Sequence, residues 1–213
     1  MTKTLLDIIN LKKSYEHRNG IVDLFENVNI KIKSGDLIAL VGPSGSGKSS
    51  FLHLLALLDD PTKGKILLKN KNTKNFTGEE KNQARKKDIS IIFQDNNLLS
   101  DFTAIENVMM PLIIKGEKTN IAIEKAKRLL KEVKILNRIN HFPNELSGGE
   151  QQRVAIARAL ISQTDIILAD EPTGNLDYKT SEDIFSYFLK LKKLNKAIIF
   201  ATHNRELANK ADY

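Results

Sequence analysis

A glycine-rich stretch in the first quarter of the chain constrains the fold more than any other feature. Residues 42–49 read Gly-Pro-Ser-Gly-Ser-Gly-Lys-Ser, and they lie between the apolar run Leu37–Val41 and the helical pattern Ser49–Leu58. A buried strand that enters such a loop and a helix that leaves it create a turn lined by backbone N–H groups at the positive end of a helix dipole. The pattern G-x-x-x-x-G-K-[ST] in this context predicts a phosphate-binding loop.

The side chains of this loop match the groups of a nucleoside triphosphate. Lys48 supplies a compact positive charge for the β- and γ-phosphate oxygens, and the hydroxyl of Ser49 is a ligand for Mg²⁺. A Gly/Ser turn that matches the pattern by chance is the alternative, and the flanking strand and helix argue against it. The residues predicted to bind the nucleotide here are Gly42, Pro43, Ser44, Gly45, Ser46, Gly47, Lys48, Ser49 and Ser50.

Two acidic residues follow another apolar run. Ile166–Ala169 is followed by Asp170 and Glu171. Asp170, at the carboxyl end of a strand, is placed to hold Mg²⁺ through water, and Glu171 to orient or deprotonate an attacking water. A solvated turn or a helix cap would explain the pair taken alone. Beside a phosphate-binding loop, the pair predicts a hydrolytic site.

The apolar runs and the helical patterns alternate along the chain. Leu37–Val41, Ile166–Ala169 and Ile198–Ala201 lack polar alternation, which is typical of strands covered on both faces. Stretches with helical periodicity lie between or beside them: Ser49–Leu58, Thr119–Lys134, Glu150–Ile161 and Ser181–Leu194. This order predicts an α/β fold with a mostly parallel core sheet.

The remaining parts of the chain have a different character. Leu5–Leu11 and Asn27–Lys33 alternate apolar and polar residues, as half-exposed antiparallel strands do, and Ile66–Lys69 is a further short strand candidate. Residues from about 100 to 160 contain no convincing strand. We therefore expect one domain over residues 1–213. Its core and antiparallel β-subdomain span about 1–95 and 162–213, and an inserted helical subdomain spans about 96–161.

One segment identifies a family. Residues 146–153 read Leu-Ser-Gly-Gly-Glu-Gln-Gln-Arg, which resembles the LSGGQ-type signature of ABC transporter nucleotide-binding subunits. The resemblance covers nearly the whole chain, and its motifs stand in the family's order: Tyr15, Gly42–Ser49, Gln94, Leu146–Glu150, Asp170–Glu171, Asn175–Asp177 and His203. It implies the P-loop NTPase fold of an ABC nucleotide-binding domain, ATP and Mg²⁺ as cofactors, and ATP hydrolysis.

The resemblance also implies a role for the signature itself. Ser147, Gly148, Gly149 and Glu150 stand at the start of a helix, which is an anion-binding terminus. In the family this terminus closes on the γ-phosphate of ATP bound to a second copy, in a head-to-tail dimer. A helix cap with a tight turn explains the glycines but not the whole string of residues.

The resemblance also implies roles for single residues elsewhere in the chain. Tyr15 resembles the aromatic residue that stacks on adenine, although a lone tyrosine near a strand end is usually a core residue. Gln94 resembles the glutamine that senses Mg²⁺ and the γ-phosphate, and His203 resembles the histidine that hydrogen-bonds the γ-phosphate. Asp177 resembles the residue that couples the two sites across the dimer. The alternative for Asp177 is an N-cap of the Ser181–Leu194 helix, and both roles are compatible.

Charge and composition narrow the partners. The 213 residues include 33 Lys and Arg against 26 Asp and Glu, a net charge of +7, and no cysteine. This excess of basic residues makes nucleic acid and an anionic membrane surface candidate partners. It is concentrated in residues 61–90, which hold nine basic side chains against three acidic ones and contain no nucleic-acid motif. We therefore expect no nucleic-acid partner, and either attraction to an anionic inner leaflet or a solvated lysine-rich face.

The same composition predicts the compartment. Absence of cysteine excludes disulfides and a thiol nucleophile, and it suits a reducing compartment. The first residues lack the apolar core of a signal peptide, and no apolar run approaches the roughly 20 residues of a membrane span. The sequence predicts a peripheral protein at the cytoplasmic face of the inner membrane.

Three function classes compete: a transport or membrane-remodelling ATPase, an ABC ATPase acting on DNA or ribosomes, and a nucleotide-binding regulator without turnover. Only 53 positions separate Gln94 from Ser147, which leaves no room for the long coiled coil of DNA-repair members. The chain also has one cassette, whereas ribosome-acting members usually have two. Because Lys48, Asp170, Glu171 and His203 are all present, the transport ATPase is favoured.

Two stretches indicate which transport system. Residues 97–112 resemble the corresponding segment of the lipoprotein-releasing (Lol) ATPase subunit, while residues 169–177 are also similar to macrolide-exporter and cell-division ABC ATPases. We expect lipoprotein release, with a macrolide or peptide exporter or a cell-division complex as the alternative. The expected partners are a second copy of the chain and integral membrane permease subunits.

Two further expectations concern the surface and the C-terminal end. Gln94–Pro111 is expected to line the groove for a permease helix, with Phe102, Met109 and Met110 as contacts, unless these three pack the subdomain core. Family members usually continue past the position of Tyr213 with a strand and a glycine turn. This sequence is therefore either truncated or a short member, and the last sheet edge is the part affected.

Overall fold

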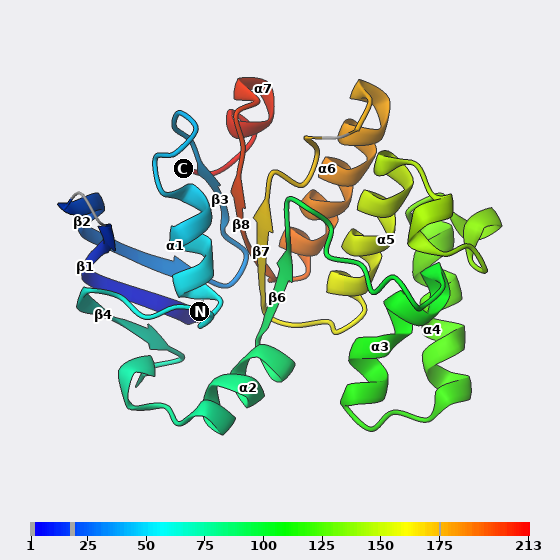
Figure 1. The fold of residues 1–213 in the computed structure, drawn as a ribbon, viewed down its shortest axis with the longest axis horizontal. Coiled ribbons are helices and arrows are strands. Elements are labelled where there is room, and N and C mark those ends of the chain that lie inside the picture. Colours follow the sequence, from blue (N-terminus) through cyan, green and yellow to red (C-terminus); the bar gives the residue numbers. More distant parts are fainter. Residues whose placement is uncertain (1–2, 18–19, 175) are drawn as a thin grey trace.

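The computed structural model describes residues 3–17, 20–174 and 176–213, which form two four-stranded sheets. The parallel sheet has the order β3-β8-β7-β6, with β3 at Leu37–Leu40, β8 at Ala197–Ala201, β7 at Ile166–Asp170 and β6 at Ile89–Ile92 (Figure 1). The three predicted parallel strands are confirmed. The fourth, β6, was not predicted: it comes from the run before Gln94, in which Ser90 interrupts the apolar residues.

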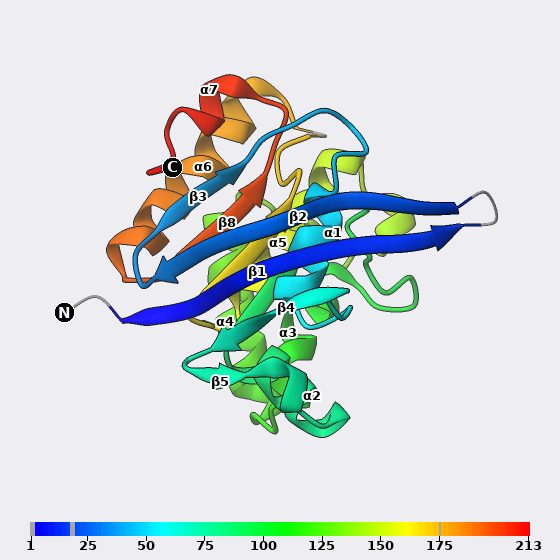
Figure 2. The same cartoon turned by 90° about the vertical axis from the view of Figure 1, so that its left-hand side faces the viewer.

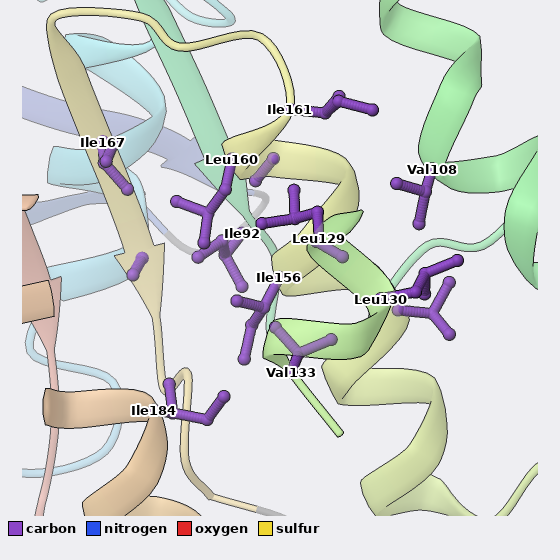
Figure 3. Close-up of a cluster of buried hydrophobic side chains, with 14 of the residues drawn as sticks. Ile92, Val108, Leu129, Leu130, Val133, Ile156, Leu160, Ile161, Ile167 and Ile184 are labelled. Carbon is purple, nitrogen blue, oxygen red and sulfur yellow. The ribbon is translucent and has the colours of Figure 1, made fainter. Parts of the chain in front are cut away.

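Side chains of the parallel sheet alternate between two hydrophobic cores. Ile167, Ala169, Ile198 and Phe200 belong to a core shared with the helices of residues 104–161, whereas their neighbours Ile166, Leu168, Ala197 and Ile199 belong to the other. Figure 3 shows the first core, where Ile92 of β6 and Ile156 and Leu160 of α5 lie beside Leu129 and Leu130 of α4. Burial on both faces explains why these strands have no polar alternation.

The second core lies between the parallel sheet, helix α1 and an antiparallel sheet of order β2-β1-β4-β5. Its strands are β1 Thr4–His17, β2 Gly20–Lys33, β4 Lys63–Leu68 and β5 Lys71–Asn72, and α1 spans Lys48–Leu55. Figure 2 shows β1 and β2 as a long hairpin. The predicted antiparallel strands are confirmed, and two of them are longer than predicted because their outer ends pair with each other away from the core.

Seven α-helices and three 3₁₀ helices lie within the described ranges. Besides α1 they are α2 Gly78–Lys87, α3 Ala104–Ile114, α4 Thr119–Glu132, α5 Gly148–Leu160, α6 Tyr178–Lys193 and α7 Arg205–Ala208, with 3₁₀ turns at Thr73–Asn75, Leu136–Arg138 and Pro143–Glu145. Helix α2 escapes sequence detection because Ala84 is its one buried residue. None of these helices is both long and apolar enough to cross a bilayer.

The segment between β6 and β7 contains helices and no described strand, as expected from the sequence. Helices α3, α4 and α5 lie beside one another (Figure 1). The subdomain boundaries near residues 96 and 161 stay a prediction.

At the C-terminal end of the chain, Ala39 N donates to Tyr213 O at 3.0 Å and Asp212 N to Leu37 O at 2.7 Å. The last residues therefore run along the outer edge of β3.

Candidate nucleotide site

The loop between β3 and α1 follows a path that only glycine permits at two positions. Gly47 has a φ of 87°, and a Cβ there would lie 3.1 Å from Cβ of Leu24 and 3.2 Å from Cδ1 of Phe25. A Cβ on Gly42 would lie 2.8 Å from Oγ of Ser46. The loop is therefore folded tightly on itself and against β2.

The N-terminus of α1 is open to an anion. No side chain caps it and its first turn carries no acidic residue. By contrast, α5 and α6 are capped by Ser147 and Asp177. The first N–H groups of a helix have no intrahelical acceptor, so an uncapped terminus offers donors and a positive dipole end to a phosphate.

Lys48 is held over this loop. Its Nζ donates to Gly42 O at 2.9 Å and to Pro43 O at 3.0 Å, which brings the ammonium group back across the turn. Ser49 and Ser50 follow in the first turn of α1 and are half-buried. The loop thus collects a cation, helix N–H groups and a hydroxyl within a few residues.

The four parallel strands deliver the predicted catalytic residues to one edge of the sheet. The predicted phosphate-binding loop follows β3, His203 follows β8, Asp170 ends β7 with Glu171 directly after it, and Gln94 follows β6. The carboxyl ends of parallel strands share one edge, and this is where ligands bind in open α/β sheets. Tertiary structure therefore brings together residues that are up to 161 positions apart in sequence.

A close contact at this edge joins Glu171 and His203. Nδ1 of His203 lies 2.9 Å from Oε2 of Glu171. Glu171 has a φ of 46° and donates its backbone N–H to Ala201 O at 3.1 Å, which anchors it to β8. Asp170 is buried, with 6% of its surface exposed. Gln94 is exposed.

The signature turn is held rigidly while its tip stays accessible. Ser147 caps α5 by accepting from Glu150 N at 3.3 Å, and Glu150 Oε2 accepts from Ser147 N at 2.9 Å. Arg138 Nε donates to Glu150 at 3.1 Å. The Ser147 backbone N–H, followed by the Ser147 hydroxyl and Arg138, lowers the pKa of Glu150 despite its partial burial. Ser147 and Gly148 remain exposed.

Asp177 is the N-cap of α6. It accepts from Thr180 N at 2.9 Å and from Thr180 Oγ1 at 2.6 Å, and the hydroxyl bond is the main reason that the pKa of Asp177 is lowered. The predicted N-cap is confirmed, and the helix begins at Tyr178 rather than near Ser181. The coupling role stays a prediction. Asn175 of the same motif lies outside the described residues.

Tyr15 is not a core residue. Its side chain is on β1, the residue is 42% exposed, and its hydroxyl donates to Asp59 Oδ2 at 2.8 Å. Nζ of Lys13 lies 4.5 Å from the ring centroid and 2.8 Å from the Asp59 carboxylate. Lys13 and Asp59 therefore hold the ring. Neither contact was predicted, because both depend on Asp59, which lies 44 positions from Tyr15 and 46 from Lys13 and is joined to them by no local pattern.

Three of the nine basic residues in 61–90 serve the fold. Lys69 pairs with Asp88 and with Asp165, Lys81 pairs with Asp60, and Arg85 donates to Leu57 O. Five of the others are exposed: Lys63, Lys65, Lys71, Lys74 and Lys87. The basic excess is therefore partly structural, and its role toward a membrane stays a prediction.

Comparisons with known proteins agree with this geometry. The family model described as "ABC transporter" matches residues 25–174. The lipoprotein-releasing system ATP-binding protein LolD of Rickettsia bellii is 46% identical over the whole chain and 94% of that relative, and LolD of Legionella pneumophila (strain Lens) is 45% identical with the same coverage.

Solved structures agree as well. The dimeric structure of MJ0796, a bacterial ABC transporter cassette, has a TM-score of 0.94 at 39% identity and covers 98% of this chain and 92% of its own. The same cassette in a post-hydrolysis state bound to ADP and Pi has a TM-score of 0.94 at 38% identity, with the same coverage. This chain therefore belongs to the ABC transporter family, as an ATP-binding subunit with the cassette fold and ATPase activity.

Proposed function

We propose that this chain energises the release of lipoproteins from the inner membrane toward the outer membrane. The observation that carries the proposal is the likeness of the full chain, at 44–46% identity, to seven curated relatives that bear the name of the lipoprotein-releasing system. The segment 97–112 supports the same assignment. A macrolide or peptide exporter and a cell-division complex are the alternatives, since the segment 169–177 is similar in those ATPases.

In the proposed hydrolysis, Lys48 and the N-terminus of α1 hold the phosphates, and Tyr15 stacks on adenine. Glu171 accepts a proton from the attacking water, whose oxygen forms the new bond to the γ-phosphorus while the bond to the β,γ-bridging oxygen breaks. His203 donates a hydrogen bond to the γ-phosphate and contacts Glu171. The 2.9 Å contact between these two side chains supports their action on the same phosphate.

The residues fit a magnesium ion. Ser49 offers a hydroxyl in the first turn of α1 and Asp170 an enclosed carboxylate at the end of β7, and Gln94 completes the set proposed from sequence. Mg²⁺ keeps several waters and is usually held by one or two carboxylates plus substrate phosphates, so a site with the single carboxylate of Asp170 and the hydroxyl of Ser49 suits it. When bound, it neutralises charge on the β- and γ-phosphates.

The proposed partner at the nucleotide is a second copy of the chain. Ser147, Gly148 and Gly149 would contact ATP held by that copy, with Glu150 securing the turn and Asp177 coupling the two sites. The exposed tip of the signature turn and the dimeric state of the MJ0796 cassette support this arrangement.

The proposed membrane partners are integral membrane permease subunits that hold the chain at the cytoplasmic face. A hollow of about 500 Å³ between α2 and α3, lined by Arg85, Lys86, Pro111, Ile114 and Lys115, is a candidate part of the docking surface. Phe102 is exposed and could contact a permease helix there. Met109 instead packs against the hydrophobic core of the helical region, which was the alternative expected for it.

A reconstitution tests the proposal. The chain and the permease subunits encoded beside it are placed in liposomes that contain a lipid-modified lipoprotein. We expect ATP-dependent transfer of that lipoprotein to a soluble acceptor, and none with Glu171→Gln. ATP-dependent efflux of a macrolide without lipoprotein transfer would establish the alternative instead.

A further inference from the structure

The helix that begins at the signature turn also binds the segment that follows Gln94. Arg158, near the C-terminal end of α5, donates from Nη1 to the carbonyl oxygen of Asn97 and from Nη2 to that of Asn96, each at 2.6 Å. The planar guanidinium presents two donors in a fixed fork, so it holds two neighbouring carbonyls at once in a way that lysine cannot.

The backbone of Asn96 and Asn97 is shaped for this contact. Both have positive φ, 58° and 45°, in the left-handed region that asparagine adopts more readily than most residues other than glycine. Asn96 is 6% exposed, and its own Oδ1 is buried without a hydrogen-bond partner. The turn is also held by Asn96 N donating to Phe93 O at 3.2 Å and Asn97 N donating to Asp95 O at 2.6 Å, and the bonds to Arg158 tie this turn to α5.

Arg158 carries its charge without a carboxylate partner among the described residues. Its two bonds go to carbonyl oxygens, and burial alone lowers the pKa of its guanidinium, which still remains charged at neutral pH. Arg158 is half-buried, and a partly desolvated charge without a carboxylate partner is costly to keep for packing alone. This cost indicates a role beyond filling space.

We propose that Arg158 is a positioning residue for ATP hydrolysis, which keeps Gln94 in a fixed relation to the signature turn at Ser147. The inference rests on the proposed function, in which Gln94 senses the γ-phosphate in one site and Ser147 contacts the γ-phosphate in the other. Gln94 lies two residues before Asn96, and Ser147 lies on the same helix as Arg158, about 16 Å along its axis. A displacement of Gln94 in one site is thereby passed through α5 to the signature turn of the other.

The test uses three variants of the purified full chain. Arg158→Gln removes the charge, Arg158→Lys keeps the charge without the fork, and Arg128→Gln removes an exposed arginine of α4 as a matched control. We expect kcat to fall by about tenfold in Arg158→Gln, with an intermediate loss in Arg158→Lys, since bonds from a charged donor are lost. KM for ATP stays unchanged because the loop 42–49 is untouched, and Arg128→Gln behaves like the unmodified chain.

A double-mutant cycle with Gln94→Ala separates positioning from general stability. If Arg158 acts through Gln94, the double variant turns over no more slowly than Gln94→Ala alone. The inference would be overturned if the losses of turnover in the two single variants multiplied in the double variant. A raised KM at unchanged kcat in Arg158→Gln would overturn it as well. Thermal unfolding identifies a variant that fails to fold, in which case Arg158→Lys takes its place in the cycle.

The cycle also distinguishes this inference from the proposed function. If Gln94→Ala is impaired and the double variant loses turnover by the product of the two single losses, only the role of Arg158 is overturned. Full turnover of Gln94→Ala overturns the sensing role of Gln94 and this inference together.

Discussion

His203 and Glu171 lie in contact, with Nδ1 of the histidine 2.9 Å from Oε2 of the glutamate. The glutamate side chain is 14% exposed and the histidine side chain 75% exposed, so the imidazole covers the carboxylate from the solvent side. Both follow neighbouring strands, β7 and β8, and the anchoring bond from Glu171 N to Ala201 O fixes the spacing between them. The contact holds the proposed base in one orientation.

Glu171→Gln tests the proposed base. The amide keeps the size of the side chain and its bond to His203, but it cannot accept the proton of the attacking water. We expect turnover to fall by about 10²–10⁴-fold, while ATP affinity is unchanged and an ATP-bound dimer accumulates. Phosphate release and size-exclusion chromatography measure these effects. Undiminished hydrolysis would remove Glu171 as the base.

Lys48→Ala tests the phosphate-binding loop. The substitution removes the charge beside the phosphates and the two bonds to Gly42 O and Pro43 O. We expect ATP affinity to fall by at least about tenfold, because one charge-assisted hydrogen bond to the phosphates is lost. Equilibrium binding of a fluorescent ATP analogue measures it. Lys87→Ala, an exposed lysine at the end of α2, serves as the control and should bind normally.

Ser147→Ala separates the capping role of the signature serine from its proposed role in the dimer. Ser147 and Thr77 both cap a helix through a capping box, with Glu150 and Glu80 respectively. Each substitution by alanine should lower the free energy of unfolding by about 1 kcal/mol. We expect only Ser147→Ala to weaken ATP-dependent dimerisation and turnover. Equal activity in the two variants, measured beside urea unfolding, would leave Ser147 with a structural role alone.

The capping boxes predict a dependence of stability on acid. Hydrogen bonds from Thr77, Thr103 and Ser147 hold the pKa values of Glu80, Glu106 and Glu150 below their ordinary value of 4.5. The unfolded chain therefore binds more protons than the folded one in this range, so this stability is complete above about pH 4.5 and is lost as the pH falls through the folded-state values.

Urea unfolding as a function of pH measures this dependence. In Glu106→Gln the amide oxygen still accepts from Thr103 but no longer titrates. We expect the stability of this variant to fall less steeply below about pH 4.5 than that of the unmodified chain. Parallel curves would show that the Thr103–Glu106 box contributes nothing to acid unfolding.

The sequence by itself determined the features that depend on consecutive residues. The glycines of residues 42–49, the capping pair Ser147 and Glu150, and the apolar runs of β3, β7 and β8 each specify a local backbone path, so their type and place could be predicted. A lysine-rich helix such as α2, with one buried residue, has no apolar periodicity and could not.

Only the tertiary structure decided which of these pieces meet. The contact of Glu171 with His203, the contacts of Asp59 with Tyr15 and Lys13, and the bonds from Arg158 to Asn96 and Asn97 join residues that are 32 to 62 positions apart. No periodicity encodes such pairs, because they depend on the strand order β3-β8-β7-β6 and on how α5 packs on the sheet. Burial of apolar side chains on both faces stabilises the sheet, and the polar contacts depend on that packing.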